Sequence, residues 1–234
     1  MVRADQLNSL INRKRVFLMN NLLQEISPSL QAGKAKDVKA LVEKALEEGL
    51  GAKDILEEGL LAGMDVIAGK FKNNEVYVPE VLIAARAMNM GMTVLGPALT
   101  ESGAKAIGKA IIGTVKGDLH DIGKNLVRMM FEGKGIEVID LGVDVSAEQF
   151  LKAYHDEKPD IVALSALLTT TMGEMKSTVD AFVEGGVREN VTIMVGGAPV
   201  TDHFCESIAA DIYTADAASA AEAAKRAILE RKGA

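Results

Sequence analysis

The chain has 234 residues, of which 48% are hydrophobic and 25% are charged, and this length can bury the core of one large domain or two small ones. Its net charge of −7 argues against nucleic-acid binding through bulk charge, and its single cysteine excludes a disulfide framework and a cysteine-cluster metal site. Three histidines (His120, His155 and His203) exclude most multi-histidine metal sites unless carboxylates contribute.

The first 20 residues do not have the composition of a targeting signal. Arginine, aspartate, lysine and asparagine interrupt their apolar positions, so the unbroken apolar core of a signal peptide is missing. No stretch of the sequence approaches the roughly 20 apolar residues that a membrane-spanning helix needs. We therefore expect a cytoplasmic protein that engages neither a membrane nor nucleic acid.

Apolar residues recur at helical spacing throughout the first hundred residues. The spacing predicts four helices, over residues 7–22, 38–46, 56–71 and 78–95. Pro28 is expected to end the first of them, and Gly96 with Pro97 the last, because proline interrupts a helix. Amphipathic helices joined by short loops predict an antiparallel four-helix bundle, which we assign to residues 1–104.

The pattern changes after a polar stretch at residues 100–105, which we interpret as a linker. Short apolar runs then predict five strands, over residues 110–115, 136–141, 161–165, 191–195 and 212–215. Between and after them the sequence predicts five helices, over residues 121–133, 147–155, 171–187, 202–208 and 216–230. Strict alternation predicts a doubly wound parallel sheet over residues 105–234, with ligands bound by the loops at the carboxyl ends of its strands.

The loop after the first strand carries an aspartate, a histidine and a glycine at Asp118, His120 and Gly123. An aspartate two residues from a histidine can accept the proton of one ring nitrogen, which leaves the other nitrogen free to ligate a metal or to act as a base. Gly123 permits close approach of a ligand at the start of the next helix. The alternative is that Asp118 or Asp121 caps that helix.

Two further loops contain polar or small residues. Hydroxyl groups follow the third strand, at Ser165, Thr169, Thr170 and Thr171. They could bind a polar ligand or a carboxylate, or Thr170 or Thr171 could cap the next helix. The glycine pair at residues 196–197 permits a bulky group to approach the backbone, although two glycines before a proline also form an ordinary tight turn.

Taken together, these loops resemble the motifs of the cobalamin-binding domain. The matching motifs are Asp-x-His-x-x-Gly at residues 118–123, Ser-x-Leu at residues 165–167 and Gly-Gly at residues 196–197. The helical half is similar to the cap domain of the same family, notably over residues 63–71 and 78–80. The resemblance implies a helical cap followed by a Rossmann-like, flavodoxin-like five-stranded sheet. In size and layout the chain looks like the small corrinoid proteins of methyltransferase systems.

The resemblance also implies a cofactor and its ligands. The cofactor would be cobalamin, as methylcobalamin or cob(I)alamin, or a related corrinoid. Its dimethylbenzimidazole would be displaced from cobalt and His120 would become the lower axial ligand, with Asp118 and then Thr171 continuing a hydrogen-bonded relay. The other implied cofactor contacts are Gly117, Leu119, Asp121, Ile122, Gly123, Ser165, Leu167, Thr169, Gly196, Gly197 and Ala215, together with Glu57, Phe71 and Val78 of the cap. Val78 stands where relatives often have leucine or phenylalanine.

The activity implied by the resemblance is methyl carriage. A substrate-specific methyltransferase would methylate the cobalt, and a second methyltransferase, acting on tetrahydrofolate or coenzyme M, would take the methyl group, with a reductive activation protein as a further partner. The cap would have to move aside for each transfer, so a flexible linker is expected at residues 101–105.

Three other function classes are compatible with parts of the pattern. A cobalamin-dependent regulator or light sensor usually adds a DNA-binding module, for which this chain has only a short N-terminal helix. A carbon-skeleton mutase would need a catalytic barrel supplied by a separate chain. A phosphoreceiver needs an aspartate at the end of the third strand, where this chain has Ser165. A methyl-transfer assay distinguishes the carrier from the regulator and the mutase subunit.

Overall fold

The computed structural model describes residues 21–102 and 106–233, except for the side chain of residue 100. The chain divides into two compact units, Met1–Lys105 and Ala106–Ala234. The sequence placed the division between residues 104 and 105. Most of the linker expected at residues 101–105 lies outside the described residues, as does the greater part of the first predicted helix.

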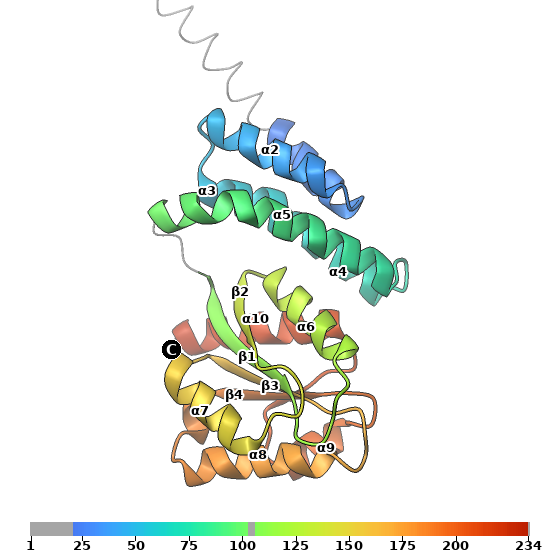
Figure 1. Ribbon diagram of the computed structural model, residues 1–234, viewed down its shortest axis with the longest axis vertical. Helices are drawn as coiled ribbons and strands as arrows, with labels where there is room; N and C mark the ends of the chain where they lie inside the picture. The colour runs from blue at the N-terminus through green and yellow to red at the C-terminus, as the bar shows by residue number, and fades with distance from the viewer. Residues whose placement is uncertain (1–20, 103–105, 234) are drawn as a thin grey trace, which may run out of the picture. The chain divides into compact units, whose positions relative to one another are not determined.

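The first unit is helical throughout the part that is described. Residues 21–31 form a helix. It is followed by α2 (Ala35–Glu47), by the continuous run α3 (Ala52–Asp54), η1 (Ile55–Leu61) and α4 (Ala62–Lys72), and by α5 (Val78–Ser102) (Figure 1). The apolar positions Val38, Val42 and Ala45 fall on one face of α2 and are fully buried, which is why this segment forms an amphipathic helix. The predicted helical region is confirmed.

Two prolines that were expected to end helices lie inside helices instead. Pro97 is inside α5, which continues to Ser102. The ring of a proline normally disfavours a helical residue before it by colliding with that residue's Cβ, but Gly96 has no Cβ, so the helix continues. Pro28 is likewise inside the helix of residues 21–31, which ends at Gln31, and Gly33 follows two residues later with a φ of +68°.

Helix α5 has a stretch, Val78–Leu99, that is long and apolar enough to cross a membrane by length and composition alone. No such stretch was expected from the sequence, because charged and polar residues such as Arg86, Asn89 and Thr93 interrupt its apolar residues. One face of this helix, with Val81, Ala84 and Leu95, is fully buried inside the helical unit. Burial explains the apolar residues of this face only, because 39% of the apolar stretch is buried and Leu82 and Ile83 are exposed.

The second unit is a parallel sheet with helices on both faces. Its elements are β1 (Gly108–Thr114), α6 (Ile122–Glu132), β2 (Ile136–Asp140), α7 (Ala147–Glu157), β3 (Ile161–Ser165), α8 (Met172–Glu184), the short turn η2 (Arg188–Asn190), β4 (Thr192–Gly196), α9 (Asp202–Ser207), β5 (Ile212–Tyr213) and α10 (Ala217–Gly233). The strand order is β2-β1-β3-β4-β5, and every pairing is parallel. The predicted α/β fold is confirmed, although β5 is shorter than expected.

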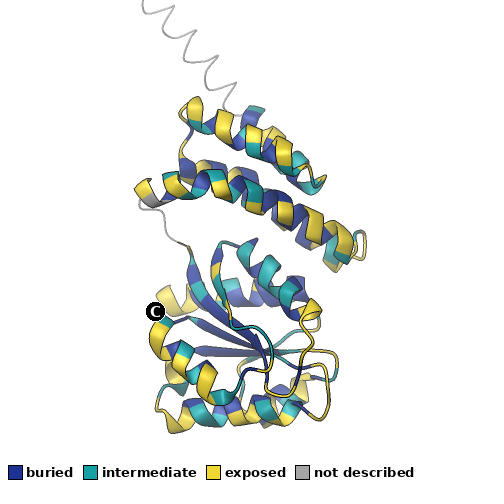
Figure 2. Ribbon diagram, viewed as in Figure 1, coloured by how far each residue is buried: buried dark blue, intermediate teal, exposed yellow. Residues whose placement is uncertain are grey.

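The core of this unit lies on both sides of the central strands. Helices α6 and α10 cover one face, and α7, α8 and α9 cover the other (Figure 1). Ile111 of β1, Phe150 of α7 and Phe182 of α8 are fully buried in one apolar cluster. Because both faces are covered, β1, β3 and β4 are buried almost throughout their length (Figure 2).

The strand order determines where a ligand site can form. Strand β1 lies between β2 and β3, so the chain leaves β1 toward one side of the sheet and later returns on the other side. The loops that follow such neighbouring strands diverge at the carboxyl edge and open a crevice there. The loops singled out in the sequence, after β1, β3 and β4, all lie at this edge (Figure 1).

Candidate functional site

The centre of the carboxyl edge is Asp118, a carboxylate that is fully buried on the loop between β1 and α6. Its Oδ1 accepts the backbone N–H of His120 at 3.0 Å and lies 2.7 Å from Nδ1 of the same imidazole. Its Oδ2 accepts the backbone N–H groups of Leu167 at 2.7 Å and Leu168 at 3.2 Å. The hydroxyl of Thr171 donates to this Oδ2 at 2.9 Å. The loops after β1 and β3 are therefore joined through one carboxylate.

The surroundings of Asp118 keep it ionised. Burial by itself raises the pKa of this carboxyl, but the backbone N–H groups of His120 and Leu167, the His120 ring and the Thr171 hydroxyl outweigh burial and hold its pKa well below the usual range. An ionised carboxylate can only accept, so the proton between the two side chains belongs to Nδ1 of His120. In the neutral imidazole, Nε2 then carries the free lone pair, and the ring is half exposed, at 51%.

Helix capping does not account for these residues. Asp121 precedes α6 and Thr171 precedes α8, and neither side chain makes a capping hydrogen bond to its helix. The Asp121 carboxylate accepts from the side-chain amide of Asn125, and Thr171 is directed to Asp118 and to the carbonyl of Leu168. The structure therefore brings Asp118, His120 and Thr171 together for a reason other than helix termination.

Sequence reasoning missed Thr114, the last residue of β1. It is fully buried, and its Oγ1 donates to the carbonyl oxygen of His120 at 2.8 Å. The hydroxyl thus fixes the backbone of the residue whose side chain Asp118 orients. A polar residue at the end of an otherwise apolar buried strand is a signal that could have identified it.

Large apolar side chains are exposed around the two loops that meet at Asp118. Leu119 on the first loop and Ile122, the first residue of α6, are 72% and 76% exposed, and Leu167 and Leu168 on the second loop are 43% and 41% exposed. A cluster of exposed apolar side chains at a ligand-binding edge indicates a surface that a largely apolar group covers. These residues lie on, or directly after, the loops that carry the exposed imidazole and its support.

The two adjacent glycines after β4 have different roles. Gly197 has a φ of +134°, and a Cβ there would lie 1.8 Å from the carbonyl oxygen of Ala166. Gly197 is therefore required by the close approach of this loop to the end of β3. A Cβ on Gly196, or on Gly123 of α6, would meet no atom within 4 Å, so these two positions adjoin open space. Gly117 also needs the conformational freedom of glycine, because its φ of +79° lies in the left-handed region.

The other predicted residues of the second unit also lie at the carboxyl edge. Ser165 is half-buried at the end of β3, and Thr169 is exposed on the following loop. Ala215 is exposed on the loop after β5, two residues beyond the end of that strand. Ser165 and Thr169 follow β3, the neighbour of β1, whereas Ala215 follows β5 at the far side of the sheet. Among the described residues, no hydrogen bond joins any of the three to the imidazole of His120.

Comparison with known proteins shows the family. Residues 108–228 match the family model of a B12 binding domain, and residues 22–95 match a second B12 binding domain model. This chain belongs to the B12-binding corrinoid proteins. A dimethylamine corrinoid protein of Methanosarcina acetivorans is 40% identical over 211 residues, 89% of this chain and 96% of the relative. A trimethylamine corrinoid protein of the same organism is 43% identical over 187 residues, 79% and 86% of the two chains.

A solved structure extends the likeness to three dimensions. A chain in the methanol:cobalamin methyltransferase complex of Methanosarcina barkeri aligns with this corrinoid protein at a TM-score of 0.81 and 32% identity. The alignment covers 89% of this chain and 80% of that chain. The helical unit and the α/β unit are thus both parts of a known corrinoid-protein architecture.

The residues present at the carboxyl edge fit a corrinoid. Among the described residues, no group of three or more His, Cys, Asp and Glu side chains could hold a metal ion unaided. A corrin supplies four nitrogens to cobalt, so the corrinoid protein needs to add only one, and the exposed Nε2 of His120 is suited to do so. The exposed side chains of Leu119 and Ile122 offer an apolar surface, and the open space at Gly196 offers room for a bulky group.

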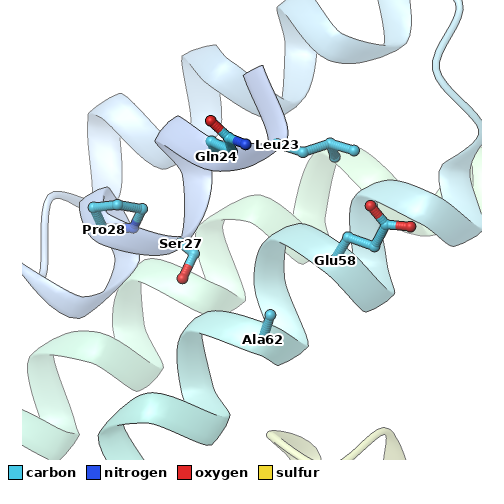
Figure 3. A pocket seen from close by; sticks show the side chains of 6 residues that line it. All are labelled: Leu23, Gln24, Ser27, Pro28, Glu58 and Ala62. Carbon is cyan, nitrogen blue, oxygen red and sulfur yellow. The ribbon is translucent and has the colours of Figure 1, made fainter. Parts of the chain in front are cut away.

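The predicted cap residues belong to the helical unit. Glu57 is exposed on η1, with an oxygen 3.7 Å from Nζ of Lys53, while Phe71 and Val78 are half-buried at the ends of α4 and α5 that face each other across a short loop. A hollow in this unit has a different lining, formed by Leu23, Gln24, Ser27, Pro28, Glu58 and Ala62 (Figure 3). This hollow and the predicted cap residues therefore do not coincide.

Proposed function

We propose that this corrinoid protein carries a methyl group between two methyltransferases, with His120 as the lower axial ligand of cobalt. The observation that supports the proposal most directly is the half-exposed imidazole of His120, whose Nδ1 is 2.7 Å from the buried carboxylate of Asp118. The bound corrinoid supplies a cobalt that can accept and release a methyl group. The protein's contribution is to bind, orient and protect it.

The Asp118–His120 pair suits an axial ligand that must both bind and release. An ionised Asp118 makes the imidazole a better electron donor through its Nδ1–H. When the imidazole is not bound to cobalt, Asp118 still retains it, because the carboxylate is fixed by Leu167, Leu168 and Thr171 and not by the cofactor. The ring can therefore return to the same position after each cycle.

The similar proteins support the choice of donor and partner. Relatives at 40% and 43% identity are named for dimethylamine and trimethylamine, and the structural relative belongs to a complex for methanol. We infer that the donor is a small methylated amine or methanol, and that the chain assembles with a methyltransferase specific for it. A second methyltransferase using tetrahydrofolate or coenzyme M, a reductive activation protein and a cytoplasmic setting complete the proposal.

The axial assignment is tested with the full chain loaded with cobalamin. Protein labelled with ¹⁵N-histidine and containing cobalt(II) should show electron paramagnetic resonance splitting that changes with the label. His120→Ala should lose that splitting, whereas His155→Ala, which alters an exposed histidine on α7, should retain it. An unchanged lower-ligand spectrum in His120→Ala would overturn the assignment.

Methyl carriage is tested separately from the axial ligand. With the cobalt first reduced chemically to cobalt(I), the methyltransferase that copurifies with the chain should methylate the bound cobalamin from dimethylamine, trimethylamine or methanol, releasing methylamine, dimethylamine or water. The methylated form should accumulate to about one equivalent of the bound cofactor, and a cofactor-free chain should yield none. Failure with every donor, in a protein that binds cobalamin through His120, would contradict methyl carriage and favour a regulatory role.

A further inference from the structure

The loop between β2 and α7 contacts the Asp118–His120 loop through a residue that sequence analysis did not single out. Asp144 accepts the backbone N–H of Gly117 on its Oδ1 at 2.7 Å. Its own backbone N–H donates to the carbonyl oxygen of Asp118 at 3.0 Å. One residue therefore fixes Gly117 and Asp118 in succession, immediately before the turn that leads to His120.

The strand order explains why this contact exists. Because β1 lies between β2 and β3, its loop is bordered by the β3–α8 loop on one side and by the β2–α7 loop on the other. The β3–α8 loop binds the carboxylate of Asp118, through Leu167, Leu168 and Thr171. The β2–α7 loop binds its backbone, through Asp144. The orientation of Asp118 thus depends on both neighbours.

The β2–α7 loop is itself well fixed. The carbonyl of Gly142 accepts the N–H of Thr114 at 3.0 Å, and the N–H of Val145 donates to the carbonyl of Thr114 at 2.9 Å. At the start of the loop, the Asp140 carboxylate accepts from the N–H of Gly142 and from the buried ammonium of Lys124. These bonds connect the loop to β1 and α6, so Asp144 is presented from a rigid support.

We propose that Asp144 is a positioning residue for His120: it fixes the backbone on which the axial imidazole and its Asp118 partner are carried. The inference rests on the axial role of His120 proposed above. Asp144 has a φ of +55°, a left-handed conformation that aspartate and asparagine tolerate better than other side chains. Its short side chain also brings a hydrogen-bond acceptor to the backbone N–H of Gly117. The position therefore uses both the tolerance of aspartate for a positive φ and its carboxylate.

Two substitutions separate the side-chain bond from the backbone conformation. Asp144→Gly keeps the left-handed conformation and removes the acceptor, whereas Asp144→Asn keeps both. In the cofactor-free chain, the Gly117 amide of Asp144→Gly should exchange its hydrogen on the order of fivefold to tenfold faster than in the unsubstituted chain, the effect of losing one hydrogen bond. Asp144→Asn should restore slow exchange. Glycine adopts a φ of +55° without strain, so Asp144→Gly is expected to fold.

A matched control lies at the opposite edge of the sheet. Asp160 also accepts a backbone N–H, that of Lys109 at 2.8 Å, so Asp160→Gly removes a similar bond at the amino end of β3, together with an ion pair to Nζ of Lys232 at 3.3 Å. Asp160→Gly should leave the hydrogen exchange of the Gly117 and His120 backbone amides unchanged. In the cobalamin-loaded chain, Asp144→Gly should increase the fraction without a histidine ligand several-fold, as read from the cobalt(II) resonance spectrum, and Asp160→Gly should not.

Three results would overturn the inference. Unchanged exchange of the Gly117 amide in Asp144→Gly would show that the bond does not order the loop. Equal changes in the resonance spectrum of Asp144→Gly and Asp160→Gly would show only general destabilisation. If Asp144→Asn behaved like Asp144→Gly, the side-chain acceptor at position 144 would not be what fixes the loop. Because exchange is measured without cofactor, it tests loop positioning even if His120 proves not to bind cobalt, so the two proposals can fail independently.

Discussion

At the scale of single residues, the decisive feature is a buried charge whose hydrogen-bonding capacity is filled by the protein. Asp118 is fully buried, a position in which an unpaired carboxylate would be strongly unfavourable. Backbone N–H groups from its own loop and from the loop after β3 compensate for that cost. As a result Asp118 can remain ionised and oriented toward His120 whether or not a cofactor is bound.

Replacement of this carboxylate should reduce stability. In Asp118→Asn, the amide nitrogen of the new side chain cannot accept from His120, Leu167 or Thr171. We expect a loss of about 2 to 4 kcal/mol in the free energy of unfolding of the cofactor-free chain at pH 7, measured by urea denaturation. Asp121→Asn, on the exposed part of the same loop, should change it by less than about 0.5 kcal/mol.

The pH dependence of the same experiment has a definite sign. Because the pKa of Asp118 is lower in the folded chain than in the unfolded chain, its contribution is present at neutral pH and is lost as the pH falls below about 4. The difference in stability between the unsubstituted chain and Asp118→Asn should therefore narrow toward acid pH. A difference that stays constant from pH 7 to pH 3 would contradict the depressed pKa.

At the scale of elements, the site is built where the ends of adjacent strands approach one another. The loop after β4 comes so close to Ala166, just beyond β3, that only glycine fits at position 197. The preceding residue, Gly196, ends β4 and adjoins open space. One glycine of the pair therefore serves the fold, and the other leaves room beside it.

Substitution of the two glycines should separate these effects. Gly197→Ala should lower the free energy of unfolding by about 2 to 5 kcal/mol, through backbone strain and collision with Ala166. Gly196→Ala should change stability by less than about 0.5 kcal/mol but weaken cobalamin binding roughly tenfold, because its methyl group occupies the open space. Thermal unfolding and cobalamin titration measure the two quantities. Equal stability of the two variants would contradict the packing described for Gly197.

At the scale of the whole molecule, the chain consists of two units with separate cores. The apolar cluster that contains Ile111, Phe150 and Phe182 draws its residues mainly from β1, β3, β4 and the helices α7, α8 and α9, all within Ala106–Ala234. The Asp118–His120–Thr171 arrangement is also contained in this unit. This apolar cluster and the hydrogen bonds that join Asp118, His120 and Thr171 therefore consist of residues of the α/β unit.

The α/β unit should therefore fold when produced alone. Residues 106–234 are expected to unfold in one cooperative thermal transition and to bind cobalamin through His120, with the histidine-ligated spectrum of the full chain. Circular dichroism and absorption spectroscopy provide the measurements, and the same segment with His120→Ala is the control. An unfolded or aggregated product would show that the helical unit contributes to the core.

The sequence by itself determined the order and type of most elements. Short apolar runs typical of buried strands alternate with amphipathic segments typical of helices, because each kind of element buries its apolar residues at its own spacing. This alternation located the loops after β1, β3 and β4. Local chemistry also identified Asp118 and His120, because an aspartate two residues from a histidine can contact its ring within one loop. These features depend on residues that are near one another in the chain.

Only the tertiary structure decided which distant residues complete the site. Leu167 and Thr171 reach Asp118 from 49 and 53 residues away, and Asp144 reaches Gly117 from 27 residues away, because β3 and β2 lie on opposite sides of β1. Hydrogen bonds between loops depend on strand order and on close backbone approach, which leave no periodic trace in a sequence. Asp118 and His120 could therefore be found from their own loop, and Thr171 from the family resemblance, but the contacts of Leu168 and Asp144 could not.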